Sequence, residues 1–170
     1  MRFSGTVRIA AIAAAALGFH GCGAKTDAPS TPAAKAPAGH KGHEHHAPHG
    51  GALVALGEEF AHLEFVLDAA TGELTAYALD GEAENAVRLK QPSIGLKIKL
   101  KKEGQAKELA LALAPVGNPL TGETLGDTSE YHGGATDLAN VQAFDATLEA
   151  VEIRGQSFAA VAFNYPKGNE

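Results

Sequence analysis

Residues 59–81 read EFAHLEFVLDAATGELTAYALDG, and they decide the fold class of this chain. Apolar and polar side chains alternate through residues 59–68 and again through residues 73–79, which is the period of a β-strand with one buried face. Thr71-Gly72 between the two runs and Asp80-Gly81 after them are turn-forming pairs. The stretch therefore predicts two antiparallel strands joined by a tight turn.

Further alternating runs indicate that the rest of the carboxyl part is built in the same way. They are residues 52–56, 94–101, 109–113, 144–153 and 158–165, separated by segments rich in turn-forming residues. Residues 115–140 do not alternate and are rich in Gly, Thr and Asp, which predicts a long loop. We expect residues 50–170 to form one all-β domain, either an antiparallel sandwich or a barrel-like sheet.

The composition limits what this chain can bind and how it is stabilised. It has 170 residues, with 20 acidic and 14 basic side chains and a net charge of −6. Because the basic residues are scattered, we expect no nucleic-acid partner. A single cysteine excludes an internal disulfide framework. We also expect no enzyme, because the motifs of serine hydrolases, zinc proteases and phosphate-binding loops are absent from the sequence.

The amino end resembles the export signal of a bacterial lipoprotein. Two arginines precede an apolar stretch, residues 9–19, that is too short to span a bilayer. Gly21 followed by the sole cysteine, Cys22, resembles the lipobox, in which the chain is cut before the cysteine and its sulfur carries diacylglycerol. The resemblance implies a signal peptide over residues 1–21 and a lipid anchor to a membrane of the cell envelope, on its periplasmic face. A secreted protein with a spare thiol is the alternative.

Two segments separate this anchor from the β-rich domain. Residues 22–39 combine Cys22 with Ala, Pro, Gly, Ser and Thr and lack large apolar side chains, so we expect a flexible linker. Residues 40–49 hold five of the eight histidines of the chain, and we expect this histidine-rich leader to be disordered. These histidines are His40, His43, His45, His46 and His49.

The histidine-rich leader predicts binding of a divalent transition metal. Neutral imidazole is the side chain most used for zinc, copper(II) and nickel. The irregular spacing defines no single geometry, so a solvated tract that binds metal only as a purification tag does is the alternative. On the strand that follows, His62 and Glu64 project to the same side, about 6.6 Å apart. There they could meet His49 across the hairpin, so we take His62, Glu64 and the five leader histidines as candidate ligands.

The leader and the first strands together carry a second resemblance. The run Pro48-His49-Gly50-Gly51, then His62-Leu63-Glu64-Phe65 and Tyr77-Ala78-Leu79-Asp80, is similar to a small β module beside histidine-rich leaders. That module occurs in periplasmic adaptor proteins of heavy-metal efflux systems and in short bacterial lipoproteins. The resemblance covers residues 40–90 and implies metal binding or delivery, with metal-efflux components as partners. The helical hairpin and lipoyl-like domain of a full adaptor are missing, so it implies metal handling and not efflux itself.

Taken together, these patterns predict an exported lipoprotein that binds zinc, nickel or copper as a periplasmic buffer or donor. The alternative is a structural or protein-interacting envelope lipoprotein with incidental histidines. In that case we expect the β-rich domain to dock a partner through residues 115–140.

Overall fold

The computed structural model describes residues 45–102 and 105–169, which form an all-β domain. Its elements are β1 (Ala52–Leu56), β2 (Ala61–Asp68), β3 (Glu73–Leu79), β4 (Ile94–Lys102), β5 (Gln105–Pro115), β6 (Glu130–Gly134), the short 3-10 turn η1 (Thr136–Leu138), β7 (Phe144–Ile153) and β8 (Gln156–Tyr165). In this part of the chain, no helix is long and apolar enough to cross a membrane.

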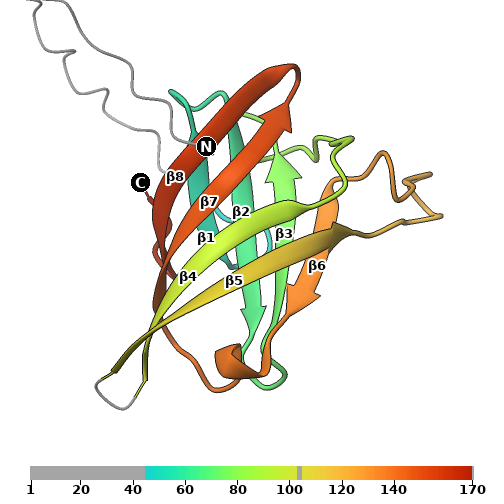
Figure 1. Ribbon diagram of the computed structural model, residues 1–170. Helices are drawn as coiled ribbons and strands as arrows, with labels where there is room; N and C mark the ends of the chain where they lie inside the picture. Colours follow the sequence, from blue (N-terminus) through green and yellow to red (C-terminus); the bar gives the residue numbers. More distant parts are fainter. Residues whose placement is uncertain (1–44, 103–104, 170) are drawn as a thin grey trace, which may run out of the picture. The chain divides into compact units, whose positions relative to one another are not determined.

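The eight strands form one antiparallel sheet in the order β1-β2-β3-β6-β5-β4-β7-β8. The sheet curls into a nearly closed barrel, in which β1 to β3 lie opposite β4, β5 and β7 (Figure 1). The expected all-β fold is therefore confirmed, in its barrel-like form.

The residues after β8 bridge the gap between the two ends of the sheet. Asn169 lies against β1, where its side-chain carbonyl accepts a hydrogen bond from the Ala55 amide at 2.8 Å and its side-chain amide donates to the Ala55 carbonyl at 3.1 Å. This side chain thus fills hydrogen-bonding positions that a neighbouring strand would otherwise take.

The inner face of the barrel is apolar and well filled. Phe65 from β2 stacks on Phe163 from β8 with ring centroids 4.6 Å apart, so two strands that are far apart in the sheet order are in contact across the interior. Tyr131 from β6 is fully buried and donates its hydroxyl proton to the Gln91 carbonyl at 2.8 Å. A buried phenol with a satisfied hydroxyl adds packing area without leaving an unpaired polar group.

The strands expected over residues 52–56, 59–68 and 73–79 are present and form an antiparallel meander. Its first and third strands have the predicted limits, whereas β2 begins at Ala61 because residues 57–60 form a turn. The prediction of one long loop over residues 115–140 was wrong, because β6 lies inside it and pairs with both β3 and β5. Only Tyr131 of β6 is fully buried, so this strand lacks the alternation that reveals the others.

In the last hairpin, the alternation of buried and exposed residues is interrupted in the middle of both strands. On β7 the buried residues Leu148 and Val151 are three positions apart, so a strict period of two is broken. The pairing register with β8 continues unchanged past this point, while Ala160 adopts a left-handed backbone with φ of 55°. Both strands therefore shift together, in place of a bulge on one strand.

Candidate metal centre

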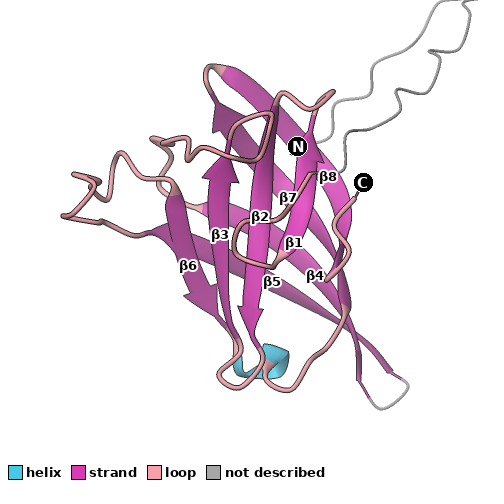
Figure 2. Ribbon diagram, turned by 180° about the vertical axis from the view of Figure 1, so that it is seen from behind, coloured by secondary structure: helices cyan, strands magenta, loops and turns pink. Residues whose placement is uncertain are grey.

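A polar site lies on the outer face of β1, β2 and β3, the side seen in front in Figure 2. The inner side chains of β2 belong to the apolar core, so His62 and Glu64 project from the other side of the strand. Both are nevertheless 0% exposed. Residues 45–51, here called the strap, contact this face, and Ala47 packs beside Leu53 and Leu79. The strap thus belongs with the folded domain, which differs from the boundary expected at residue 50.

The carboxylate of Glu64 fixes one end of the strap. It accepts hydrogen bonds from the backbone N–H groups of His49 at 2.9 Å and Gly51 at 2.8 Å, and from Nδ1–H of the His49 ring at 2.8 Å. Its oxygens are therefore occupied by protein donors. Glu64 acts in this arrangement as an anchor of the strap, and the Nδ1 contact leaves the lone pair of the neutral His49 ring on Nε2.

The ring of His49 also packs against an aromatic side chain. It stacks on Tyr77 of β3, with centroids 3.7 Å apart and planes 12° apart. Tyr77 is the cross-strand partner of Glu64. The Glu64 carboxylate and the Tyr77 ring therefore lie side by side, and both contact His49. Burial raises the pKa of the Tyr77 phenol, and the nearby charges of Glu130 and Glu64 raise it further. Tyr77 is therefore a neutral stacking surface at physiological pH.

The other end of the strap brings two imidazoles together. The rings of His45 and His62 lie with centroids 4.8 Å apart. Nδ1 of each ring faces a backbone carbonyl, that of Glu82 at 3.4 Å for His45 and that of Asp80 at 3.1 Å for His62. Because a carbonyl can only accept, each ring donates from Nδ1, which leaves the lone pair of the neutral His45 ring on Nε2.

Nε2 of His45 is an unusual atom. The side chain of His45 is 5% exposed, and its Nε2 is buried without a hydrogen-bond partner among the described residues. Oε1 of Glu59 lies 3.8 Å from this nitrogen, which is beyond hydrogen-bonding distance. Buried polar atoms nearly always have a partner, so an orphaned nitrogen beside a second imidazole marks this end of the strap as a candidate metal centre.

The loop that supplies the carbonyls is braced by its own carboxylate. Asp80 accepts hydrogen bonds from the side-chain amide of Asn85 at 2.7 Å and from the backbone N–H of Glu84 at 3.0 Å. The Asn85 hydrogen bond holds the pKa of Asp80 below its usual value. Asp80 therefore shapes the loop that faces His62 while its carboxylate is engaged elsewhere.

The structure does not bring the predicted ligands together in one place. Glu64 meets His49, and His62 meets His45, so His49, His62 and Glu64 do not converge on one point. His46 is exposed. The predicted ligands His40 and His43, and the predicted lipid-anchor residue Cys22, lie outside the described residues. Within residues 45–102 and 105–169, no group of three or more His, Cys, Asp or Glu side chains could hold a metal ion as the side chains stand.

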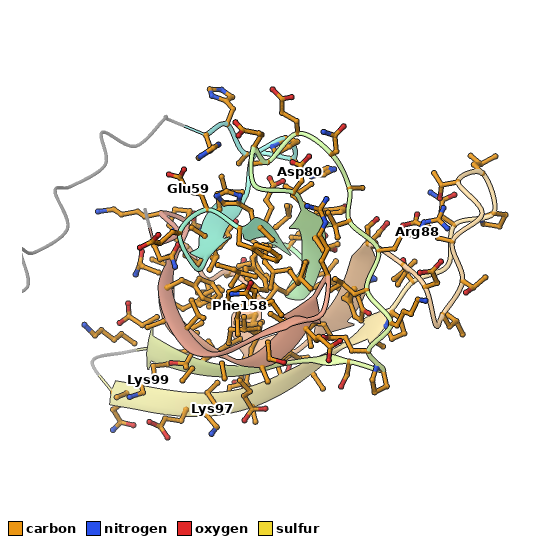
Figure 3. The ribbon with its side chains drawn as sticks, turned by 90° about the horizontal axis from the view of Figure 1, so that it is seen from above. Glu59, Asp80, Arg88, Lys97, Lys99 and Phe158 are labelled. Atoms are coloured by element: carbon orange, nitrogen blue, oxygen red, sulfur yellow. The ribbon has the colours of Figure 1, made fainter. Side chains whose placement is uncertain are left out.

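Glu59 was missed by reasoning from the sequence. Its place in an apparently alternating run assigned it to a strand, but it lies in the turn between β1 and β2 with a φ of 59°. Gly57 is the local signal that could have found this turn. Figure 3 shows Glu59 and Asp80 on the same side of the barrel, away from Lys97 and Lys99.

A comparison of the chain with models of known protein families, with curated proteins and with solved structures finds no match.

Proposed function

We propose that this protein is an exported, lipid-anchored protein of the cell envelope that binds a divalent transition metal as a buffer or donor. The single observation that carries the proposal is the buried, unpartnered Nε2 of His45 beside the ring of His62. Zinc, nickel and copper(II) all bind neutral imidazole, and both rings have their Nδ1 protons directed at carbonyls.

The energetics favour an occupant at this position. A buried polar atom without a partner costs about 1–3 kcal/mol. A metal ion would accept the Nε2 lone pair and remove this penalty, and a histidine whose other nitrogen is hydrogen-bonded is already oriented for coordination. The chain has one cysteine and one methionine, at positions 22 and 1, so the donors at this site are nitrogen and oxygen. Such donors suit zinc, nickel and copper(II) better than copper(I).

The envelope location of the proposal depends on Cys22 and on the export signal before it. An acyl chain on the cysteine would hold an acidic domain at a membrane. Changing Cys22 to Ser should therefore move the protein from the membrane fraction to the soluble fraction. Mass spectrometry that finds an unmodified Cys22 in the membrane-bound protein would contradict the anchor. Components of a metal-efflux system remain the proposed partners.

Calorimetric titration of the full-length protein with zinc, nickel and copper(II) tests the metal function. We expect one binding class tighter than the rest, lost in His45→Ala and in His62→Ala. His132→Ala is the matched control, because His132 is an exposed histidine on the outer face of β6, 3.8 Å from Glu73. If wild type and His62→Ala give the same titration, the protein binds metal only as a histidine tag does.

The second candidate function is protein docking through the loop between β5 and β6. Leu120 is 96% exposed and Leu125 is 68% exposed, although both are large apolar residues. The loop is nevertheless fixed, because the Arg88 guanidinium donates to the Thr121 carbonyl and to Asp127. Two leucines on a braced loop favour contact with an apolar surface of another protein. Changing both to Ser should then abolish association with envelope proteins while leaving metal binding intact.

A further inference from the structure

We propose that Glu59 is the third ligand of the His45–His62 centre, and that the centre keeps one exchangeable position for handing over a divalent ion such as zinc or nickel. This inference rests on the proposed metal function and goes beyond it by naming the ligand set and the kind of site.

Three segments of the chain meet at His45. His45 comes from the strap, Glu59 from the turn between β1 and β2, and His62 from β2. His45 is in contact with both of the others, at 3.8 Å from the carboxylate and 4.8 Å between rings. His45, whose Nε2 has no hydrogen-bond partner, thus has a second imidazole and a carboxylate as neighbours.

The distance between His45 Nε2 and Glu59 Oε1 is close to that of two ligands on one ion. Zinc binds nitrogen and carboxylate oxygen at about 2.0–2.1 Å, so two such ligands of a tetrahedral ion lie about 3.3 Å apart. The separation of 3.8 Å between His45 Nε2 and Glu59 Oε1 is roughly half an ångström wider than that. The partly exposed Glu59 side chain has room to close this gap by a change of rotamer.

The backbone of Glu59 is held in an uncommon left-handed conformation. A non-glycine residue with a φ of 59° is uncommon, and such residues persist where the surroundings hold them. Here the Glu59 carbonyl packs so closely on Gly81 that a Cβ on that glycine would lie 2.4 Å from the oxygen. Gly81 follows Asp80, whose carbonyl faces His62, so the turn and the second imidazole are held by the same loop.

Three protein ligands define the kind of site. Structural zinc sites use four protein ligands, while sites with three keep a position for water or an incoming ligand. A donor set of two nitrogens and one oxygen with an open position allows another protein or a small chelator to bind the ion before the first three ligands release it. This is the property required of a metal donor.

The test compares two neighbouring glutamates in the full-length protein. Glu59→Gln removes the proposed ligand, and Glu58→Gln makes the same change of charge at the adjacent exposed residue. We expect Glu59→Gln to weaken the tightest zinc binding by at least tenfold and to change the visible spectrum of the cobalt(II)-loaded protein. Glu58→Gln should stay within twofold of wild type. Azide should shift the cobalt spectrum of the wild type by entering the open position.

The outcomes separate this inference from the proposed function. If His45→Ala and His62→Ala lose the tight class but Glu59→Gln retains it, the function stands and the role of Glu59 is overturned. If neither histidine variant differs from wild type, the proposed function itself fails. Lack of an azide effect would overturn the exchangeable position. Glu59→Asn is the second variant in case Glu59→Gln unfolds, because asparagine tolerates positive φ, and it should show the same loss.

Discussion

The carboxylate of Glu64 accepts hydrogen bonds from both the backbone N–H and the ring of His49, and these two bonds set the position of the strap. Four residues before His49, His45 lies over His62, which is two residues before Glu64 on β2. The strap therefore advances four residues while the strand beneath it advances two, about 6.6 Å. The anchor at one end determines which histidine reaches the candidate metal centre at the other.

Loss of this anchor should destabilise the domain. In Glu64→Gln, one carboxylate oxygen is replaced by an NH₂ group, and the negative charge that strengthens the hydrogen bonds from His49 and Gly51 is lost. We expect the free energy of unfolding to fall by about 2–3 kcal/mol in urea titrations. Glu73→Gln is the control, because Glu73 is exposed, and it should change stability by less than about 0.5 kcal/mol. Equal effects of both changes would contradict the anchoring role.

Gly168 should be intolerant of any side chain. Its φ is 80°, and a Cβ there would lie 1.8 Å from the carbonyl oxygen of Leu53 on β1. Gly168→Ala must therefore displace the closing segment from β1, and we expect a loss of more than about 2 kcal/mol measured by chemical unfolding. Gly126→Ala provides the comparison, since a Cβ there meets nothing within 4 Å, and it should be close to neutral.

Replacing Glu59 by glycine should raise stability while it removes the proposed ligand. A left-handed backbone costs a residue with a Cβ about 1–2 kcal/mol, and glycine avoids most of this cost. We expect the melting temperature of the metal-free Glu59→Gly protein to rise by a few degrees. Glu58→Gly, at a position without positive φ, should lower it. A melting temperature below wild type in Glu59→Gly would show that the turn is not strained.

The loop between β5 and β6 should weaken in acid. Burial alone would raise the pKa of Glu123, but hydrogen bonds from Ser129 and Thr121 outweigh it and hold the pKa below its usual value of 4.5. A lowered pKa means that the charged carboxylate stabilises the folded loop above pH 4.5, and that this contribution is lost as the pH falls through the lowered pKa. Wild type should therefore melt above Glu123→Gln at pH 7, with the difference shrinking toward pH 3. A difference that is constant across this range would contradict the assignment.

The strands that follow simple alternation could be predicted from the sequence. Residues 73–79 have one buried face and tight turns on both sides, so local information is sufficient. The neighbour of β3 could not be predicted in this way. It is β6, which has one fully buried side chain and two glycines, and which is joined to β3 only by pairing between residues far apart in the chain.

The candidate site was partly predictable for the same reason. His49 and Glu64 meet because the pairing of β1 with β2 brings Gly51 beside Glu64, and a hairpin of this kind can be inferred locally. The contact of His45 with His62 depends on how the strap crosses the face, and the irregular spacing of the leader histidines carries no information on that path. The position of Glu59 depends on a left-handed turn that alternation concealed.

The contact of Asn169 with Ala55 has a kinetic consequence. These two residues are 114 positions apart, so the barrel closes only after nearly the whole domain has been synthesised. Contacts of such long sequence separation slow folding, because the entropy of closing the intervening chain is lost before the contact forms. Until residue 169 arrives, the outer edge of β1 lacks this cover. A ribosome-bound fragment that ends before it should therefore expose that edge to other strands, and association of nascent chains should stop once the carboxyl end emerges.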